Sequence, residues 1–115
     1  MRKITVSLIA ILVITATIFA RDSYTKNLNL EPNSSENFSR KFEERMSVTV
    51  QISSGDLGSG RIVAEVYDPS GSKVASGSKG FSFNTKNTKG NYKVVVKNET
   101  NKRQKVEVSV NTSGS

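Results

Sequence analysis

Apolar and polar residues alternate along much of the chain, and the alternation is clearest between residues 80 and 110. A period of two is typical of β-strands that bury one face and expose the other to water. Segments 85–90 and 98–103 interrupt the pattern with Asn, Thr, Lys and Gly, the composition of hairpin loops. The pattern therefore predicts an antiparallel meander of three strands, with these residues facing the core: Phe81, Phe83, Tyr92, Val94, Val96, Val106, Val108 and Val110.

The chain before this stretch contains further short alternating segments. An Asp-Pro-Ser-Gly turn at residues 68–71 separates two of them. About eight strands at regular spacing predict an all-β fold, an antiparallel β-sandwich with Ig-like or jelly-roll layers. The strands expected upstream of the meander cover residues 28–31, 37–42, 46–53, 61–67 and 73–75.

The first residues of the chain have a different composition. Arg2 and Lys3 precede an uncharged, mostly apolar segment at residues 4–20. This order is typical of an export signal or a signal anchor, and it predicts an N-terminal hydrophobic helix with the rest of the chain outside the cytoplasm. A helix of that length spans about 26 Å, slightly less than a hydrocarbon core of about 30 Å, so an uncleaved membrane anchor and a cleaved signal peptide both remain open.

The chain is accordingly divided into four parts. We expect a signal anchor or signal peptide at residues 1–21 and a polar tether at residues 22–27. A single β-sandwich domain follows at residues 28–111, and residues 112–115 form a disordered tail.

The amino-acid composition excludes several kinds of catalytic and metal-binding site. The chain contains no cysteine and no histidine, so thiol nucleophiles, disulfides and the commonest general base and neutral metal ligand are all absent. Asp56, Glu65 and Asp68 lack the Asp-x-Asp spacing of a calcium loop. Glu43 and Glu44 are adjacent and point apart, which does not suit a pair of catalytic acids. We therefore predict a non-enzymatic protein with no catalytic residue, no metal site and no cofactor.

The formal net charge of +7 is unevenly distributed along the chain. Residues 73–105 contain nine Lys or Arg residues and one acid, Glu99. Such a segment suits an anionic surface polymer or lipid headgroups, although lysines also keep strand surfaces and edges soluble. Scarce arginine and the lack of interleaved aromatic residues argue against nucleic acid. The candidate anionic-ligand patch comprises Lys86, Lys89, Lys93, Lys97, Lys102 and Lys105.

Three further features are candidates for function. Val63 and Tyr67 point outward from the expected fourth strand and form a candidate partner surface, unless the first strand or a loop covers them. Tyr92 is expected to bury its ring and direct its hydroxyl at backbone. Of four Asn-x-Ser/Thr sequons, Asn33 and Asn98 lie in predicted turns and are candidates for glycosylation.

Several motifs follow one another in a recognisable order. A strand ends in the Asp-Pro-Ser-Gly turn at residues 68–71, a Phe-x-Phe strand covers 81–83, and Gly-x-Tyr opens a strand at 90–92. An Asn-rich turn after Asn98 and a last strand of alternating valines complete the order. Together they resemble the GOLD (Golgi dynamics) domain of secretory-pathway cargo receptors over about residues 28–110. The resemblance implies a lumenal or extracytoplasmic β-sandwich that binds other proteins, often its own relatives.

The chain departs from eukaryotic GOLD proteins in two respects. Those proteins carry a cysteine pair in this domain, and they continue into a coiled coil, a C-terminal membrane span and a sorting tail. Neither feature occurs in these 115 residues. We expect the fold and a protein-binding role to be shared, in a chain that meets the membrane only through residues 4–20. The bacterial pre-peptidase C-terminal sandwich, which has a similar Asp-Pro-x-Gly turn, is a second candidate relative.

Overall fold

The computed structural model describes residues 21–55 and 60–114, and the regular elements within these ranges are all β-strands. The predicted N-terminal helix lies outside the described residues. Within the described ranges no helix has the length and apolarity that a membrane crossing requires. The strands are β1 (Arg21–Leu30), β2 (Ser35–Phe42), β3 (Met46–Ser54), β4 (Ile62–Tyr67), β5 (Lys73–Gly77), β6 (Gly80–Asn84), β7 (Gly90–Asn98) and β8 (Gln104–Gly114).

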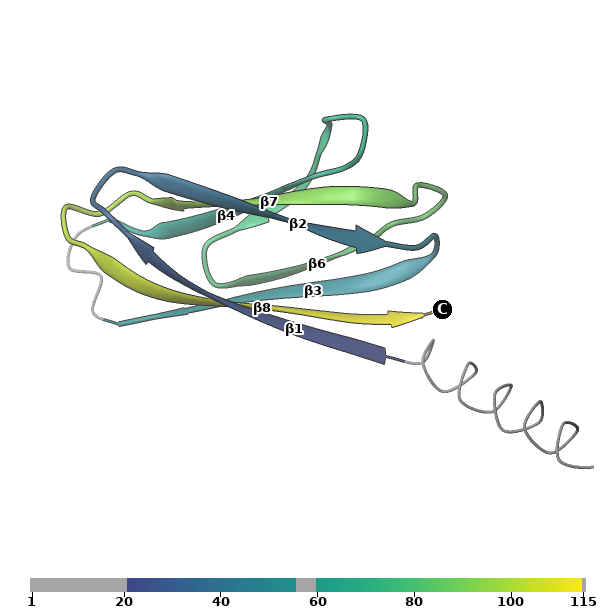
Figure 1. The fold of residues 1–115 in the computed structure, drawn as a ribbon, viewed down its shortest axis with the longest axis horizontal. Coiled ribbons are helices and arrows are strands. Elements are labelled where there is room, and N and C mark those ends of the chain that lie inside the picture. The colour runs from purple at the N-terminus through teal and green to yellow at the C-terminus, as the bar shows by residue number, and fades with distance from the viewer. Residues whose placement is uncertain (1–20, 56–59, 115) are drawn as a thin grey trace, which may run out of the picture.

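The strands form two four-stranded antiparallel sheets that pack face to face (Figure 1). Sheet A has the order β1-β8-β3-β6, and sheet B has the order β2-β7-β4-β5. The predicted all-β, antiparallel, eight-stranded sandwich is therefore confirmed. β1 begins and β8 ends at the same end of the sandwich.

The predicted meander is wrong, although its three strands exist. β6 pairs with β3 in sheet A, β7 lies between β2 and β4 in sheet B, and β8 lies between β1 and β3, back in sheet A. Alternation states which face of a strand is buried, but it does not state which strand lies beside it. A strand can bury its apolar face from either sheet, because both sheets cover the same core.

The predicted tether and tail are also wrong, because both belong to strands. Residues 22–27 form most of β1 and pair with β8, from Asp22 opposite Thr112 to Asn27 opposite Glu107. Residues 112–114 complete β8, where Gly114 lies opposite Met46 of β3. These segments lack apolar alternation, and they are held by backbone pairing with neighbouring strands and by the Tyr24 ring, whose centroid lies 5.8 Å from that of Phe38.

The core lies between the sheets and consists of the residues that alternation placed there. Val94 and Val96 of β7 face Val108 and Val110 of β8 across the sandwich, and all four are buried. Burying each such side chain contributes roughly 1.5–3 kcal/mol relative to leaving it exposed. A cluster of rings fills one end of the core, with centroid separations of 5.2 to 6.3 Å among Phe42, Phe83 and Tyr92.

Gly90 and Tyr92 fix the start of β7. The Tyr92 ring is buried, and its hydroxyl donates a hydrogen bond of 2.6 Å to the carbonyl oxygen of Thr88, as the sequence predicted. Gly90 has a φ of 136°, and a Cβ at this position would approach the ring of Pro69 to 2.8 Å. Glycine is therefore required here for both its backbone conformation and its lack of a side chain.

Asn98, at the end of β7, joins three segments of the chain. Its side-chain nitrogen donates to the carbonyl oxygens of Leu30 (3.2 Å), Glu31 (3.1 Å) and Lys102 (2.8 Å). Its side-chain oxygen accepts hydrogen bonds from the backbone N–H (3.0 Å) and the hydroxyl (2.6 Å) of Thr100. The side chain therefore ties the turn after β7 to the end of β1.

The two candidate glycosylation sites differ in accessibility. Asn98 is only 1% exposed and uses both side-chain polar atoms inside the fold, so the prediction of a glycan there is wrong. The Asn-rich composition correctly predicted a turn next to Asn98, but it does not show that the side chain of Asn98 points into the fold. Asn33 is exposed in the turn between β1 and β2 with a φ of 56°, and its modification stays a prediction.

Replacing Asn98 with alanine should destabilise the fold by about 2–4 kcal/mol, because buried carbonyl groups lose their donor and are left unsatisfied. Asn91→Ala, on the exposed side of the same strand, is the matched control and should change stability by less than about 0.5 kcal/mol. Urea unfolding followed by circular dichroism measures both variants. Equal stability of the two variants would show that the Asn98 hydrogen bonds do not hold the turn.

Candidate functional site

The outer side of sheet B carries the candidate partner surface predicted from Val63 and Tyr67. The register places Val63 opposite Lys97 of β7, and Glu65 opposite Val95. Val63, Val95 and Tyr67 are half-buried. β1, which the sequence suggested as a cover, lies at the edge of the opposite sheet and does not cover them. We call this surface, made of Val63, Glu65, Tyr67, Val95 and Lys97, the Tyr67 face.

Glu65 is the electrostatic centre of the Tyr67 face. Its carboxylate accepts a hydrogen bond of 2.8 Å from the Tyr67 hydroxyl and forms ion pairs with Lys97 (3.1 Å) and Lys73 (3.6 Å). The Tyr67 hydrogen bond, followed by Lys97, lowers the pKa of Glu65 below its ordinary value. The same carboxylate raises the pKa of Tyr67 and of Lys97. Glu65 therefore stays ionised and holds the Tyr67 ring in place, a role that differs from that of a proton donor.

Tyr67→Phe should raise the pKa of Glu65, because the variant removes the hydrogen bond that contributes most to lowering it. An NMR titration of the side-chain carboxyl groups measures the change. The pKa of Asp68 is lowered by its own hydrogen bonds to Ser70 and Ser72, so it serves as an internal control that should not move. An unchanged pKa of Glu65 in this variant would contradict the assigned hydrogen bond.

A hollow of about 420 Å³ adjoins the Tyr67 face at the turn between β4 and β5. Asp68 organises this turn, since its carboxylate accepts hydrogen bonds from the backbone N–H groups of Ser70 and Ser72, both at 3.0 Å. The Asp-Pro-Ser-Gly turn predicted from the sequence is present as expected. The hollow extends the surface beside Tyr67 as far as Lys93 of β7.

The six lysines of the predicted anionic-ligand patch do not form one surface. β7 and β8 lie in opposite sheets, so side chains that point away from the core point in opposite directions. Alternation along the chain could not reveal this separation, because it depends on which sheet each strand joins. Lys93 and Lys97 lie outside sheet B, Lys105 lies outside sheet A, Lys86 and Lys89 lie in the loop before β7, and Lys102 lies in the loop before β8 at the other end.

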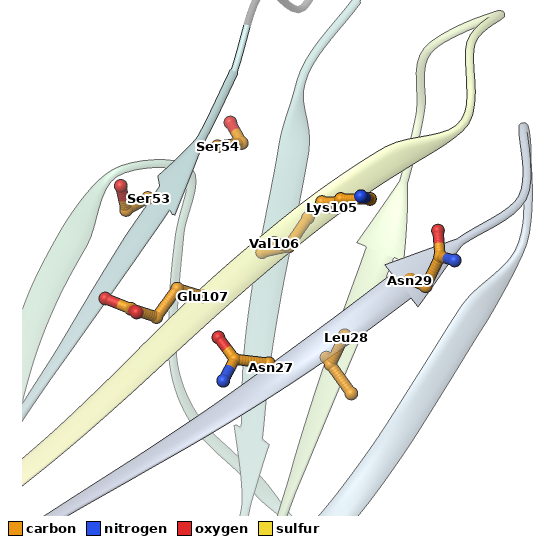
Figure 2. Close-up of a pocket in the computed structure, with 8 residues that line it drawn as sticks. All are labelled: Asn27, Leu28, Asn29, Ser53, Ser54, Lys105, Val106 and Glu107. Carbon is orange, nitrogen blue, oxygen red and sulfur yellow. The ribbon is translucent and has the colours of Figure 1, made fainter.

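The outer side of sheet A contains a hollow of about 490 Å³ that the sequence did not predict (Figure 2). Its lining comes from the second half of β1, the start of β8 and the end of β3. The register explains the convergence, because Asn27 and Ser53 both lie opposite Glu107, on either side of it. We call this site the Asn27 hollow, lined by Asn27, Leu28, Asn29, Ser53, Ser54, Lys105, Val106 and Glu107.

Neither surface contains an arrangement of residues suited to metal binding. Among the residues that the structure describes, no group of three His, Cys, Asp or Glu side chains is placed to hold a metal ion. Glu65 and Glu107 lie on opposite outer sides of the sandwich, so these carboxylates do not act on one ligand. Both surfaces carry hydrogen-bonding side chains on paired strands, and only the Tyr67 face adds half-buried apolar side chains to them.

Three solved structures of bacterial proteins have a similar fold. A periplasmic inhibitor of g-type lysozyme, PliG from Aeromonas hydrophila, superposes with a TM-score of 0.53 at 13% identity, covering 82% of this chain and 85% of that one. A mutant of the corresponding Escherichia coli inhibitor gives a TM-score of 0.50 at 13% identity, with coverage of 83% and 89%. A protein of the disulfide-linked pili of Bacillus endospore appendages gives 0.50 at 9% identity, with coverage of 82% and 86%. At these identities the likeness concerns the fold alone.

Sequence comparisons identify the family of the chain. No curated protein sequence is significantly similar to the chain. The model of the emp24/gp25L/p24 family/GOLD matches residues 25–115, nearly the whole of the described domain. This agrees with the motifs at the Asp-Pro-Ser-Gly turn, the Phe-x-Phe strand and the Gly-x-Tyr start of β7. The chain therefore belongs to the emp24/gp25L/p24 (GOLD) family.

Proposed function

We propose that this chain is a non-enzymatic, extracytoplasmic domain that binds other proteins, members of its own family among them, through the Tyr67 face. The observation that supports this most directly is the half-buried group of Val63, Val95 and Tyr67 on an outer strand surface, where solvent-facing residues are normally polar. An aromatic anchor with aliphatic neighbours and a charged surround is the usual composition of a protein-binding hot spot.

The fixed position of Tyr67 adds to this proposal. Its hydroxyl is bound to Glu65, which is held in turn by Lys97 and Lys73. An aromatic ring that is already oriented loses little conformational freedom when a partner packs on it. A partner that packs on this ring would also shield the Glu65 ion pairs from water, which strengthens them.

The extracytoplasmic location is supported by sequence and family together. Arg2 and Lys3 precede the uncharged segment at residues 4–20, which is the order of an export signal or anchor. GOLD domains, which this chain resembles in its motifs, are lumenal or extracytoplasmic, and two proteins of similar fold are described as periplasmic. We propose that residues 1–21 direct export and attach the domain to the membrane when they are retained.

A photo-crosslinking amino acid at position 63 of the full chain should form a discrete adduct with a partner protein in the host cell. Tyr67→Ala in the same chain should weaken that association by about 10- to 100-fold, because it removes the central anchor. Added salt should change the adduct little, since the contact is mainly apolar.

The matched control places the same crosslinker at Ser109, in the middle of the outer side of sheet A. This position should give no adduct that responds to Tyr67→Ala. An adduct from position 63 that persists in the Tyr67→Ala variant would show that partners do not dock on this face.

A further inference from the structure

The two long edge strands of the sandwich lie on the same side of the molecule. β1 is at the edge of sheet A and β2 is at the edge of sheet B, and the rings of Tyr24 and Phe38 lie 5.8 Å apart between them. β1 has ten residues and β2 has eight, and neither strand contains a proline or a register shift in its pairing. Each strand has a strand neighbour on one side only within the described residues, so its other side presents a long, regular row of backbone N–H and C=O groups.

The two edge strands on the opposite side of the sandwich are short. β5 and β6 have five residues each, and the pairing of β5 with β4 shifts register between Val66 and Tyr67. Short strands and β-bulges both discourage another strand from pairing at an edge. Neither device is present in β1 or β2, so the geometry of these two edges suits the addition of a strand.

Lys26 is a charged residue in the core-facing row of β1. It lies opposite Val108 of β8, between Tyr24 and Leu28 in the alternation, and all three of these neighbours face the core. Val108 is fully buried, whereas Lys26 is exposed. The lysine stem therefore lies at the rim of the core, and the ammonium group reaches water past the free edge of β1.

The Lys26 ammonium group has no carboxylate to compensate it. Glu36 and Arg40 occupy core-facing positions of β2, but Lys26 forms no ion pair with Glu36 or with any other acid among the described residues. Arg40, by contrast, is held by Asp22 at 3.6 Å and by the Tyr24 ring, whose centroid lies 3.8 Å away. The charge on Lys26 is therefore stabilised by water, and burial of this group would be costly.

Pairing of two copies through their β1 edges would bury this lysine. If both cores lie on the same side of the joined sheet, even-numbered residues of one β1, which face the core, lie opposite even-numbered residues of the other. The registers of largest overlap then place Lys26 opposite Lys26, or opposite Tyr24 of the other copy. β2 lies on the same side, so the second layer would close over these lysines and bring like charges together away from water.

We propose that Lys26 keeps β1 from pairing edge to edge with a second copy of this chain. An inward-pointing charge costs the single domain little, because water reaches it past the free edge, but it makes the shared core of a joined pair unfavourable. This role is independent of the protein-binding role of the Tyr67 face, which lies on the outer side of the other sheet.

The test measures how often the β1 edges of two full chains meet. The chain has no cysteine, so Thr25→Cys supplies a single thiol on the outward side of β1, and a short bis-maleimide joins two such thiols when two edges lie side by side. A phosphocholine detergent, with more micelles than chains, keeps the full chains dispersed. Adding Lys26→Ile should raise the association constant obtained from the crosslinked fraction at least about tenfold, which corresponds to about 1.4 kcal/mol.

The matched control is Lys105→Ile in the same Thr25→Cys chain. It removes the same charge from the outward side of β8, a strand that is paired on both sides, and should leave crosslinking unchanged. Lys26→Met, which keeps an unbranched stem, should associate as Lys26→Ile does and replaces it if isoleucine disturbs the fold.

Urea unfolding separates edge pairing from association of unfolded chains. Lys26→Ile should keep or raise the urea midpoint, because isoleucine adds an apolar contact beside Val108. Folded Lys26→Ile and Lys26→Met chains that crosslink no more than Lys105→Ile would overturn the proposal. So would crosslinking that increases only in variants with a lowered midpoint.

Discussion

The arrangement of the two sheets depends on buried polar side chains at the turns where the chain crosses from one sheet to the other. Among the strands that the structure describes, only β4 and β5 are neighbours both in the chain and in a sheet, so nearly all pairing joins strands that are distant in sequence. At one end the Thr85 hydroxyl donates to the carbonyl of Glu43 and accepts from the N–H of Met46. At the other end Asn98 joins the turn after β7 to the end of β1. Apolar alternation is compatible with many strand pairings, whereas a buried polar group is compatible only with those that supply its hydrogen-bond partners.

The difference between apolar alternation, which is local, and strand pairing, which is not, explains how far the sequence predicts the structure. Alternation identified the core valines and the strand count, because burial of one strand face is a local property. It misassigned the pairing of β6, β7 and β8, and with it the lysine patch, because sheet membership is not local. It missed the start of β1, where Ser23, Thr25 and Asn27 show no apolar alternation and the strand is recognised by its backbone pairing with β8. The Asn27 hollow was missed for the same reason, since Asn27, Ser53 and Glu107 meet only through the register of three strands.

The two outer surfaces of the sandwich differ in the kinds of side chain that their strands direct outward. In sheet B the outward side of β4 carries Val63 and Tyr67. The ion pairs of Glu65 with Lys73 and Lys97 lie beside these apolar side chains. In sheet A the outward sides of β1, β3 and β8 carry hydroxyls and amides, which avoid repulsion between like charges on closely spaced strands. Two chemically distinct surfaces therefore lie on opposite sides of one sandwich.

The absence of cysteine bears on how this family member keeps its fold. The eukaryotic GOLD proteins that the chain resembles carry a cysteine pair in this domain, and this chain has none. Asn98 alone takes part in five hydrogen bonds to backbone and side-chain groups. At about 0.5–1.5 kcal/mol net for each bond, such a set is comparable to the roughly 2–5 kcal/mol that a native disulfide contributes. Because the chain has no cysteine, its fold contains no covalent link that depends on the redox conditions of its surroundings.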